Sequence, residues 1–400
     1  MKSLILSGVV IFGTSCISSS VAADREWLLD AADVTTVKLN EVIHEAIVYL
    51  GHGTNLNSVA TITLPAGRFY LESNPDAAGT LLFNELYTGK SGKLVFRGQG
   101  RGKTTLVFND FEQVALFGKM VNGLTLQDMH FTRAAYSATQ GNVVSSRPGE
   151  IIIDIHDGYP SPEFLWRFRD LGHYLRRATN STTEPLIIQT NNDQVKYGYR
   201  GGLAYPPQFV DGNKWLFYLA DEKLDLASRG YKPGDYVAIK AKKSGFPYQF
   251  LGGERLTMDN VKWTHSTRGI IRGATDNDGN QVAFNDISIS NCLIATTKGI
   301  AGQAPILSAS GGGIQLNQPD DLPMNNISVS NCRLDSTGDD NLALFNVNNV
   351  RLENIKSINA FARSILVTTR ARNVCAENVS IINGVIEDEN HQVVTIAGCH

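Results

Sequence analysis

Two consecutive acidic residues before an apolar strand are the strongest candidates for chemistry in this chain. They are Asp339 and Asp340, in the stretch Asp335-Ser-Thr-Gly-Asp-Asp-Asn-Leu-Ala-Leu344. Neighbouring carboxylates repel each other, which raises the pKa of at least one of them and favours a proton on it. Acid–base hydrolysis of a glycosidic bond requires one protonated and one ionised carboxyl group. Gly-Asp-Asp-Asn is also good turn composition, so a structural pair is the alternative.

A recurring phrase indicates which elements must position these acids. It is an alternating apolar strand that ends in a small polar pair and a further apolar residue, and its fifth position falls at Asp128, Asn260, Asn291, Asn331, Asn354 and Asn378. The last two intervals show that the unit is roughly two dozen residues long. A unit of that length, with two or three short strands, predicts one coil of a parallel β-helix, and the regular leucines of a leucine-rich repeat are absent. We expect the five asparagines to stack as an internal amide ladder at a turn.

The same period identifies residues that lie beside the acid pair. Equivalent side chains in successive coils lie about 4.8 Å apart. One coil forward from Asp340 the count reaches Arg363, and Arg370 follows on that coil. Arginine beside carboxylates suits the binding of an acidic or hydroxyl-rich sugar. Arg363 could equally be an ion-pair partner with a purely structural role.

One coil backward, the count finds no third acid in register. It reaches Gln315, Leu316 and Asn317. Asp320 and Asp321 come a few residues later and approach the site only if their turn folds inward. We take Gln315, Asn317 and Asp320 as candidate substrate-binding residues.

The preceding coils offer further candidates. His265 and Arg268 follow the strand at 256–261, and the glycines at 311–313 form a turn that also leaves room for a sugar ring. A histidine directly after a strand more often lies on the surface or has its ring nitrogens hydrogen-bonded by neighbouring groups than acts as a catalyst. Three aromatic residues are candidate stacking platforms: Tyr248, Phe361 and Trp263, the last of which is better explained by packing against an inserted segment.

One interval is too long for a single coil. After one coil is subtracted from the stretch between Asp128 and Asn260, the remainder is still long enough for a domain. We place an inserted, mostly β module at 146–246, with a short amphipathic helix over 162–177 and strands over 214–219 and 235–240. The coils then occupy 24–145 and 247–400. Helical periodicity over 39–50 predicts a helix that caps the first coil, whose open end would otherwise expose core and backbone.

The N-terminal residues predict export. Lys2, the apolar run from Leu4 to Phe12 and the small residues that end at Ala23 are typical of a signal peptide, assigned to residues 1–22. Beyond it no run reaches the roughly 18 apolar residues that span a bilayer. We expect a secreted or periplasmic protein that does not span a membrane. Four later cysteines are too few for a disulfide framework. Cys292 and Cys332 should stack in neighbouring coils, where a bridge between them is conceivable and a pair of reduced core thiols is the commoner outcome.

The composition excludes several classes of partner and cofactor. The 400 residues are 42% hydrophobic and carry a net charge of −3, so the chain can bury a large core but has no positive field to hold nucleic acid. Neither a Cys-x-x-Cys nor a His-x-x-His pair supports a zinc site. The cluster of Asp154, His156 and Asp157 fits a turn better than a metal site. We expect a monomer with no metal site and no required cofactor, and Ca²⁺ as the one cation that its many acidic turns could hold.

Several of these features together resemble a known superfamily. The predicted cap helix, Leu64-Pro-Ala-Gly-Arg-Phe-Tyr70, the strand-rich coils and Gly338-Asp-Asp340 are similar to the right-handed β-helices of the pectate-lyase superfamily over most of residues 30–395. Gly-Asp-Asp before an apolar strand resembles glycoside hydrolases typified by polygalacturonases, and the inserted module resembles bacterial α-1,3-galactosidases. The resemblance implies an all-β, right-handed single-stranded parallel β-helix with a cap helix and an inserted module. It places Asp339 and Asp340 in the acid and base positions, although the further Asp of those hydrolases, one coil earlier, is missing here.

Three functions fit these observations. The favoured one is a secreted glycoside hydrolase that cleaves a polysaccharide or glycan by carboxylate acid–base catalysis. A polysaccharide lyase would instead remove the C5 proton of a uronate with a base such as Arg363, His265 or Lys298, and would need a cation to neutralise the uronate. A carbohydrate-binding β-helix without catalysis would use the acids only structurally.

Overall fold

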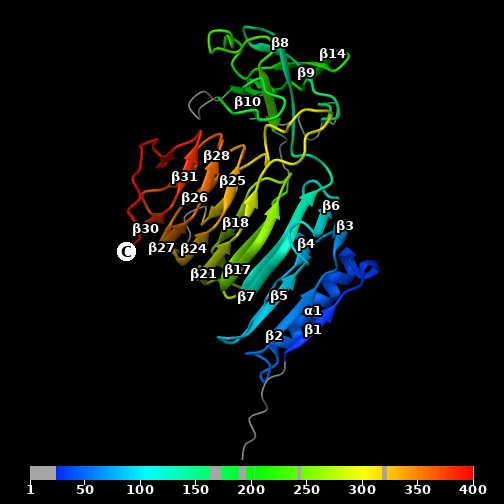
Figure 1. The fold of residues 1–400 in the computed structure, drawn as a ribbon, viewed down its shortest axis with the longest axis vertical. Helices are drawn as coiled ribbons and strands as arrows, with labels where there is room; N and C mark the ends of the chain where they lie inside the picture. Colours follow the sequence, from blue (N-terminus) through cyan, green and yellow to red (C-terminus); the bar gives the residue numbers. More distant parts are fainter. Residues whose placement is uncertain are drawn as a thin grey trace, which may run out of the picture.

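The computed structural model describes residues 24–399 apart from 163–172, 189–194, 202, 241–244 and 318–321. The expected signal peptide, Asp320 and most of the helix expected over 162–177 lie outside the described residues. The described chain forms one long, mainly parallel sheet system and one smaller antiparallel sheet. Figure 1 shows the parallel strands side by side, with the antiparallel module beyond one side of them.

The chain is a right-handed parallel β-helix, the fold that its resemblance to the pectate-lyase superfamily implies. Each coil contributes up to three strands, and each strand pairs in parallel with its equivalent in the next coil. The paired strands form three columns, called here the first, second and third columns in the order that the chain visits them. Two long strands, β7 (Val114–Arg133) and β17 (Tyr248–Trp263), turn the corners and take part in all three columns.

The other strands divide among the columns as follows. The first column contains β1 (Arg25–Leu28), β2 (Val59–Thr63), β5 (Lys93–Arg97), β21 (Phe284–Ser290), β24 (Met324–Ser330), β27 (Val347–Glu353) and β30 (Arg372–Glu377). The second contains β3 (Gly67–Leu71), β6 (Thr104–Phe108), β22 (Leu293–Ile294), β25 (Arg333–Asp335), β28 (Lys356–Ile358) and β31 (Ser380–Ile382). The third contains β4 (Gly79–Leu82), β18 (Gly269–Arg272), β23 (Ile314–Leu316), β26 (Leu342–Leu344), β29 (Ile365–Val367) and β32 (Ile386–Glu387).

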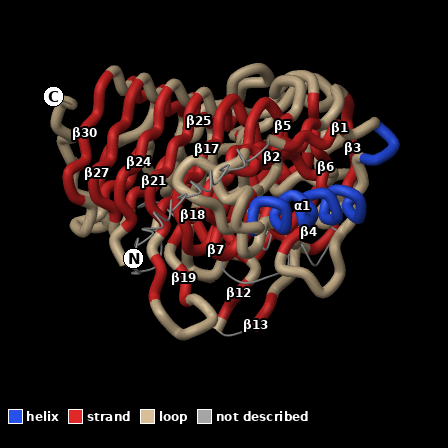
Figure 2. The backbone as a smooth tube through the Cα atoms, turned by 90° about the horizontal axis from the view of Figure 1, so that it is seen from below, coloured by secondary structure: helices blue, strands red, loops and turns tan. Residues whose placement is uncertain are grey.

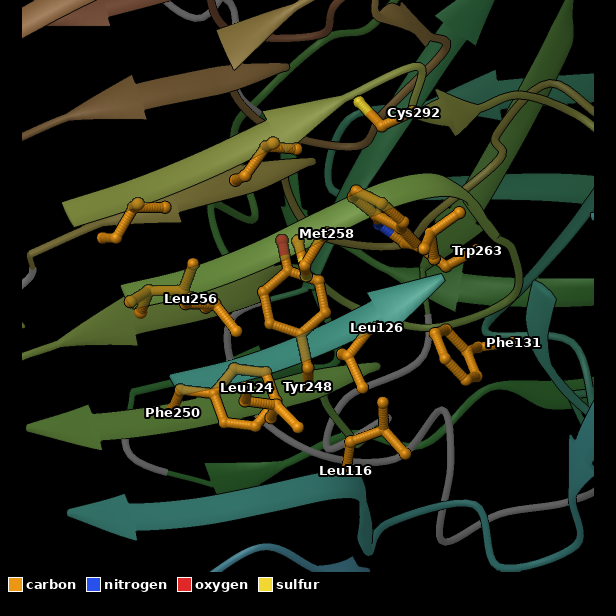
Figure 3. Packing of buried hydrophobic residues seen from close by; sticks show 14 of the residues in the cluster. Leu116, Leu124, Leu126, Phe131, Tyr248, Phe250, Leu256, Met258, Trp263 and Cys292 are labelled. Atoms are coloured by element: carbon orange, nitrogen blue, oxygen red, sulfur yellow. The ribbon is translucent and has the colours of Figure 1, made fainter. Parts of the chain in front are cut away.

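Alternate residues of these strands point inward and build a continuous core. Leu124, Leu256, Ile287, Ile327 and Val350 are partners in successive coils, and all are buried. Such stacks follow from the two-residue period of a strand combined with in-register pairing. Figure 3 shows residues of this core from close by, among them Leu124 and Leu256.

The core corrects the expectation for two aromatic platforms. Trp263 and Tyr248 are 0% exposed and meet edge to face, with ring centroids 5.5 Å apart, inside the coils (Figure 3). Neither ring is available to a sugar. Trp263 belongs to the core of the β-helix rather than to a contact with the inserted module, because its position on β17 points inward.

A helix covers the first coils, as predicted. α1 (Thr36–Gly51) follows a short 3-10 turn (Ala31–Asp33). It is capped by Thr35, whose hydroxyl accepts a hydrogen bond from the Lys38 backbone amide. Its apolar face, which includes Leu39 and Ile43, is buried against β2, β4 and β5. Figure 2 shows α1 beside β2 and β4. In the part of the chain that the structure describes, no helix is long and apolar enough to cross a membrane.

Three of the five asparagines form a ladder, and it lies outside the core. The Asn260 side chain donates instead to Asp128 Oδ1, and the Asn291 side chain to Asp259 Oδ1. All five asparagines adopt left-handed backbone, and the Asn354 amide donates to Asn331 Oδ1 at 3.0 Å, as the Asn378 amide does to Asn354 Oδ1 at 3.1 Å. Asn331, Asn354 and Asn378 are exposed. The expectation of an internal ladder was therefore wrong. The left-handed turn rotates these side chains to the outer surface, where they bond to each other from coil to coil.

Of the two states open to the stacked cysteines, the structure contains the bridged one rather than the commoner reduced pair. Cys292 and Cys332 form a disulfide, with their Cα atoms 4.6 Å apart. A second disulfide joins Cys375 to Cys399. The cause is the register itself, because stacking equivalent positions in adjacent coils brings two cysteines within bridging distance.

The inserted module is an antiparallel sheet. Its strand order is β11-β10-β16-β8-β9-β15-β14. The strands are β8 (Ala138–Arg147), β9 (Glu150–Ile155), β10 (His173–Ala178), β11 (Val195–Tyr197), β14 (Gln208–Asp211), β15 (Lys214–Tyr218) and β16 (Tyr236–Lys240). Two small hairpins, β12 (Tyr199–Arg200) with β13 (Leu203–Ala204) and β19 (Ala274–Thr275) with β20 (Gln281–Val282), complete the strands. Where a helix was expected up to residue 177, the described residues form β10, because pairing with β11 and β16 outweighs the local helical pattern.

Candidate active site

The acid pair lies on a turn at residues 336–341, between β25 and β26. Stacking on both sides holds it: the Gly313 amide donates to Asp340 O at 2.9 Å, and the Asn341 amide donates to Arg363 O at 2.9 Å. Asn341 fixes the turn from inside, because its buried side chain donates to Leu334 O and Ser357 Oγ. The turn is therefore part of the rigid stack.

A cavity of about 250 Å³ opens beside this turn. It is lined by Arg268, Gly312, Ile314, Gln315, Asp339, Asp340, Ala343, Phe345, Arg363, Leu366 and Glu389. Six residues singled out in the sequence are thus brought together, namely Asp339, Asp340, Gln315, Arg268, Arg363 and Gly312 of the glycine turn. The cavity combines carboxylates, guanidinium groups and one aromatic ring, a lining that suits a hydroxyl-rich ligand.

Asp340 is the buried member of the pair. Its side chain is 13% exposed, and Oδ1 lies 3.7 Å from Arg363 Nη1. Burial and the neighbouring charge of Asp339 raise the pKa of Asp340 to about 7, while Arg363 and Arg268 act in the opposite direction. Asp340 Oδ1 is buried without a hydrogen-bond partner among the described residues. Asp340 can therefore hold a proton near neutral pH.

Asp339 has a more open and more cationic environment. Its carboxylate is 38% exposed and lies 3.7 Å from Arg268 Nη1. Lys240, at the end of β16 in the module, is a further cation close to it. Burial lowers the pKa of Lys240 to about 8, with Arg176 acting in the same direction and Asp339 against it. The two adjacent acids thus differ in burial and in partners, which is the arrangement that separates an acid from a base.

Arg363 joins the acid pair to a third carboxylate. Leu342 pairs with Ile365, which places Arg363 beside Asp340 as the forward count predicted. Its Nε also lies 3.9 Å from Glu387 Oε2, one coil further on. Glu387 was not among the residues predicted from the sequence, although a second forward step of one period from Arg363 leads to it.

Counting backward gave the wrong neighbour. Ile314 pairs with Leu342, so this coil is longer than the one that joins Leu342 to Ile365, and Gly312 rather than Gln315 or Asn317 lies beside Asp340. The uniform period failed because the coil carries a longer connection before β24. Gly312 lines the cavity, and a Cβ there would lie 2.6 Å from Asp340 O. No acid stands at that position, and the additional carboxylates, Glu387 and Glu389, come from the last coil.

Other candidates lie away from the cavity. Asn317 is 0% exposed, and its side chain donates to Leu322 O in the same coil and to Asn346 O in the next one. Arg370 is exposed, follows β29 and does not line the cavity. Phe361, the third expected platform, is buried. None of these three residues lines the cavity, because each is buried in the stack or exposed on another of its faces.

The aromatic residue that does line the cavity is Phe345, which sequence reasoning missed. The signal was the alternation after the acid pair: Ala343 and Phe345 share one side of their segment, and both line the cavity. Glu389 was missed as well. Its carboxylate accepts hydrogen bonds from the Thr369 amide and hydroxyl, which hold it at the cavity.

His265 is a packed residue outside the cavity. It is 7% exposed, and its ring centroid lies 4.0 Å from that of Tyr136. Burial lowers the pKa of His265 to about 4, and Lys262 and Arg68 act in the same direction. At neutral pH the His265 ring is therefore uncharged in the folded protein.

This burial makes a testable contribution to acid stability. The folded pKa lies below the unfolded value of about 6.5, so the stabilisation is present above pH 6.5 and is lost as the pH falls towards 4. When the pH is lowered from 7 to 4, the free energy of unfolding of the wild type should fall because His265 must be protonated. In a His265→Gln variant this fall should be smaller by about 3 kcal/mol. Urea titrations at both pH values measure this difference. His44→Gln, at an exposed position of α1, should follow the wild type, and an equal pH dependence in all three proteins would contradict the assignment.

Metal-ligating side chains are not grouped in the described ranges. No three His, Cys, Asp or Glu side chains there come close enough together to hold a metal ion. Asp157 of the expected turn cluster accepts a hydrogen bond from the Asn213 amide instead.

The solved structures that resemble this chain and are described here are distant from it in sequence. No protein-family model and no curated protein matches the chain. Among solved structures, the Agl-KA catalytic domain has a TM-score of 0.40 at 12% identity over 92% of this chain and 46% of that one, so this chain spans under half of its length. The Azotobacter vinelandii mannuronan C-5 epimerase AlgE4 A-module has a TM-score of 0.20 at 9% identity, over 91% of each chain. A protein described as a glycoside hydrolase has a TM-score of 0.26 at 10% identity, over 90% of this chain and 95% of that one. At these identities and TM-scores the matches say nothing about the chemistry of this chain.

Proposed function

We propose that the chain is a glycoside hydrolase that cleaves a polysaccharide or glycan, with Asp340 as general acid and Asp339 as general base. The observation that carries the proposal is the contrast within one cavity between a buried Asp340, whose pKa is raised to about 7, and the adjacent, more exposed Asp339. The two disulfides support an oxidising compartment, so the protein is proposed to be secreted or periplasmic.

The proton balance of the reaction follows from these roles. Asp340 gives its proton to the glycosidic oxygen as the bond to the anomeric carbon breaks. Asp339 takes a proton from the water molecule that forms the new bond to that carbon. Asp340 ends ionised and Asp339 protonated, and a proton passes between them through solvent before the next turnover. Arg363, 3.7 Å from Asp340, stabilises the carboxylate that forms.

The rest of the lining would hold the sugar. Phe345 offers the apolar ring surface on which a pyranose can stack, and Gln315 and Glu389 offer amide and carboxylate groups to its hydroxyls. Gly312 keeps the floor open next to the acids. Asp340 Oδ1 and Arg363 Nε, which are buried without a hydrogen-bond partner in the described residues, are groups that a bound substrate could satisfy.

The activity should depend on pH through Asp340. Turnover requires the protonated acid, so it should fall as the pH rises through about 7, approaching tenfold per pH unit above that value. A Glu387→Gln variant leaves Arg363 with Asp340 as its remaining close carboxylate, which favours the ionised acid. The fall should then begin at a lower pH. Profiles of kcat between pH 4 and pH 9 measure both effects.

A matched control separates this effect from a general change of charge. Glu353→Gln removes a surface carboxylate that pairs with Arg351 in the first column, and its profile should match the wild type. A profile that stays flat between pH 6 and pH 9 in the wild type would rule out Asp340 as the acid.

One assay tests the proposed function against its alternatives. The protein is incubated with a panel of uronate-containing and neutral galactan polysaccharides, and both reducing ends and ultraviolet-absorbing unsaturated products are followed. New reducing ends without ultraviolet absorbance support the hydrolase. Unsaturated products would establish a lyase instead, and binding without either product would establish a carbohydrate-binding protein.

A further inference from the structure

The inserted module contacts the back of the turn that carries the acid pair. Arg176, on β10, is 2% exposed, and its Nη2 donates to Gly338 O at 3.1 Å. Its guanidinium carbon lies 3.1 Å from the ring centroid of Phe361, in the coil that follows. A single side chain of the module therefore touches two adjacent coils beside the acids.

A second link joins the same two parts of the molecule. The Ile187 amide, in the segment after β10, donates to Asn359 Oδ1 at 2.6 Å, and the Asn359 amide donates to Ser336 Oγ at 2.9 Å. Ala178, Ile187 and Ala238 of the module share an apolar cluster with Phe361. The module is thus packed against the turn at 336–341, and Arg176 donates to the residue that directly precedes the acid pair.

The hydrogen bond to Gly338 has a direct geometric consequence. The carbonyl of Gly338 and the amide of Asp339 belong to one planar peptide unit, so fixing the carbonyl fixes the direction in which Asp339 leaves the turn. A Cβ on residue 338 would lie 2.4 Å from Ser310 O, so this position needs glycine, the residue with the least intrinsic conformational restriction. The Gly338 amide donates to Ala309 O at 3.0 Å in the preceding coil, and Arg176 holds the carbonyl of the same residue from the module.

We propose that Arg176 is a positioning residue of the acid pair, and that the inserted module serves the reaction by holding the turn at 336–341 through it. This inference rests on the proposed function for its effect on turnover, but the positioning itself is a property of the folded chain. Lysine cannot replace arginine here, because a single ammonium group cannot lie flat on Phe361 and reach Gly338 O at once.

The neighbouring residue supplies a matched control. Arg177 follows on the same strand, lies 3.8 Å from Asp235 and faces the ring of Tyr231, all within the module. Arg176→Ala and Arg177→Ala therefore remove the same group from adjacent positions. Only the Arg176→Ala variant loses the hydrogen bond to Gly338 O in the turn at 336–341.

The first measurement needs no substrate. Hydrogen–deuterium exchange of a peptide that covers residues 336–341 should speed up about tenfold in Arg176→Ala, as expected for the loss of one hydrogen bond, and stay at the wild-type rate in Arg177→Ala. An unchanged rate in Arg176→Ala, or equal acceleration in both variants, would overturn the proposal. If Arg176→Ala does not fold, Arg176→Lys, which keeps the charge, takes its place with the same criteria.

The second measurement uses the substrate found in the polysaccharide panel. We expect Arg176→Ala to lose about a hundredfold in kcat with little change in KM, because a misdirected acid or base affects the transition state more than binding. Millimolar guanidinium should restore part of the loss in Arg176→Ala and none in Arg177→Ala. Faster exchange in a protein that cleaves nothing would remove the proposed function and leave the positioning intact. Faster exchange with full kcat would overturn the role of Arg176 in the reaction.

Discussion

An Asp340→Asn variant is expected to lose turnover by about 10³-fold while it keeps its fold. Asparagine has nearly the same shape as aspartate but cannot give a proton to the leaving oxygen. The side chain is 13% exposed beside Arg363, so removal of the acid should not open the turn. Measurement of kcat on the substrate identified in the panel, with circular dichroism to check the fold, gives the result.

Asp335, the last residue of β25 before the turn at 336–341, supplies the control for this variant. Asp335 pairs with Arg333 at 2.6 Å and does not line the cavity, so Asp335→Asn should retain most of the activity. Asp339→Asn should also be impaired, because it loses the proposed base. Full activity in the double variant Asp339→Asn, Asp340→Asn would refute the assigned roles altogether.

The largest expected effect on stability comes from Trp263→Ala. Trp263 is 0% exposed inside the coils and packs edge to face on Tyr248. Removing so large a buried ring leaves a cavity that a stack of paired coils cannot close by local collapse. We expect the free energy of unfolding to fall by about 4 kcal/mol, measured by denaturant titration.

Two further variants sharpen this prediction. The indole Nε1 of Trp263 is buried without a hydrogen-bond partner in the described residues, so Trp263→Phe removes an unsatisfied donor and should cost much less than the alanine variant. Phe209→Ala replaces an aromatic residue that is 61% exposed and should change stability little. A loss below about 1 kcal/mol in Trp263→Ala would contradict the packing described for it.

The sequence predicted those features that depend on a repeating pattern. The intervals between Asn331, Asn354 and Asn378 indicated the coil, and the coil correctly placed Arg363 beside Asp340. The cap helix followed from its periodicity. The catalytic roles of Asp339 and Asp340 are still predictions, because geometry brings the residues together without showing a reaction.

The sequence failed where the repeat is irregular. The coil that ends at the acid pair is longer than the coil that follows it, so a count based on a uniform period pointed to Gln315 and Asn317 instead of Gly312. Periodicity also gives no information on which side of a turn a side chain leaves. For that reason the asparagine ladder and the aromatic platforms were assigned to the wrong surface, and Phe345 was overlooked.

The second disulfide closes the far end of the coils. Residue Ala397 forms a parallel bridge with Cys375 on β30, and the Ala376 amide donates to Ala397 O at 2.9 Å. The C-terminal segment thus occupies part of the edge that the last coil would otherwise present, and Cys375–Cys399 fastens it there. An uncovered edge of this kind is a template on which a second molecule can add its own strands. The tail therefore leaves less of the β30 edge open to such an addition, and Cys375–Cys399 holds it in that place.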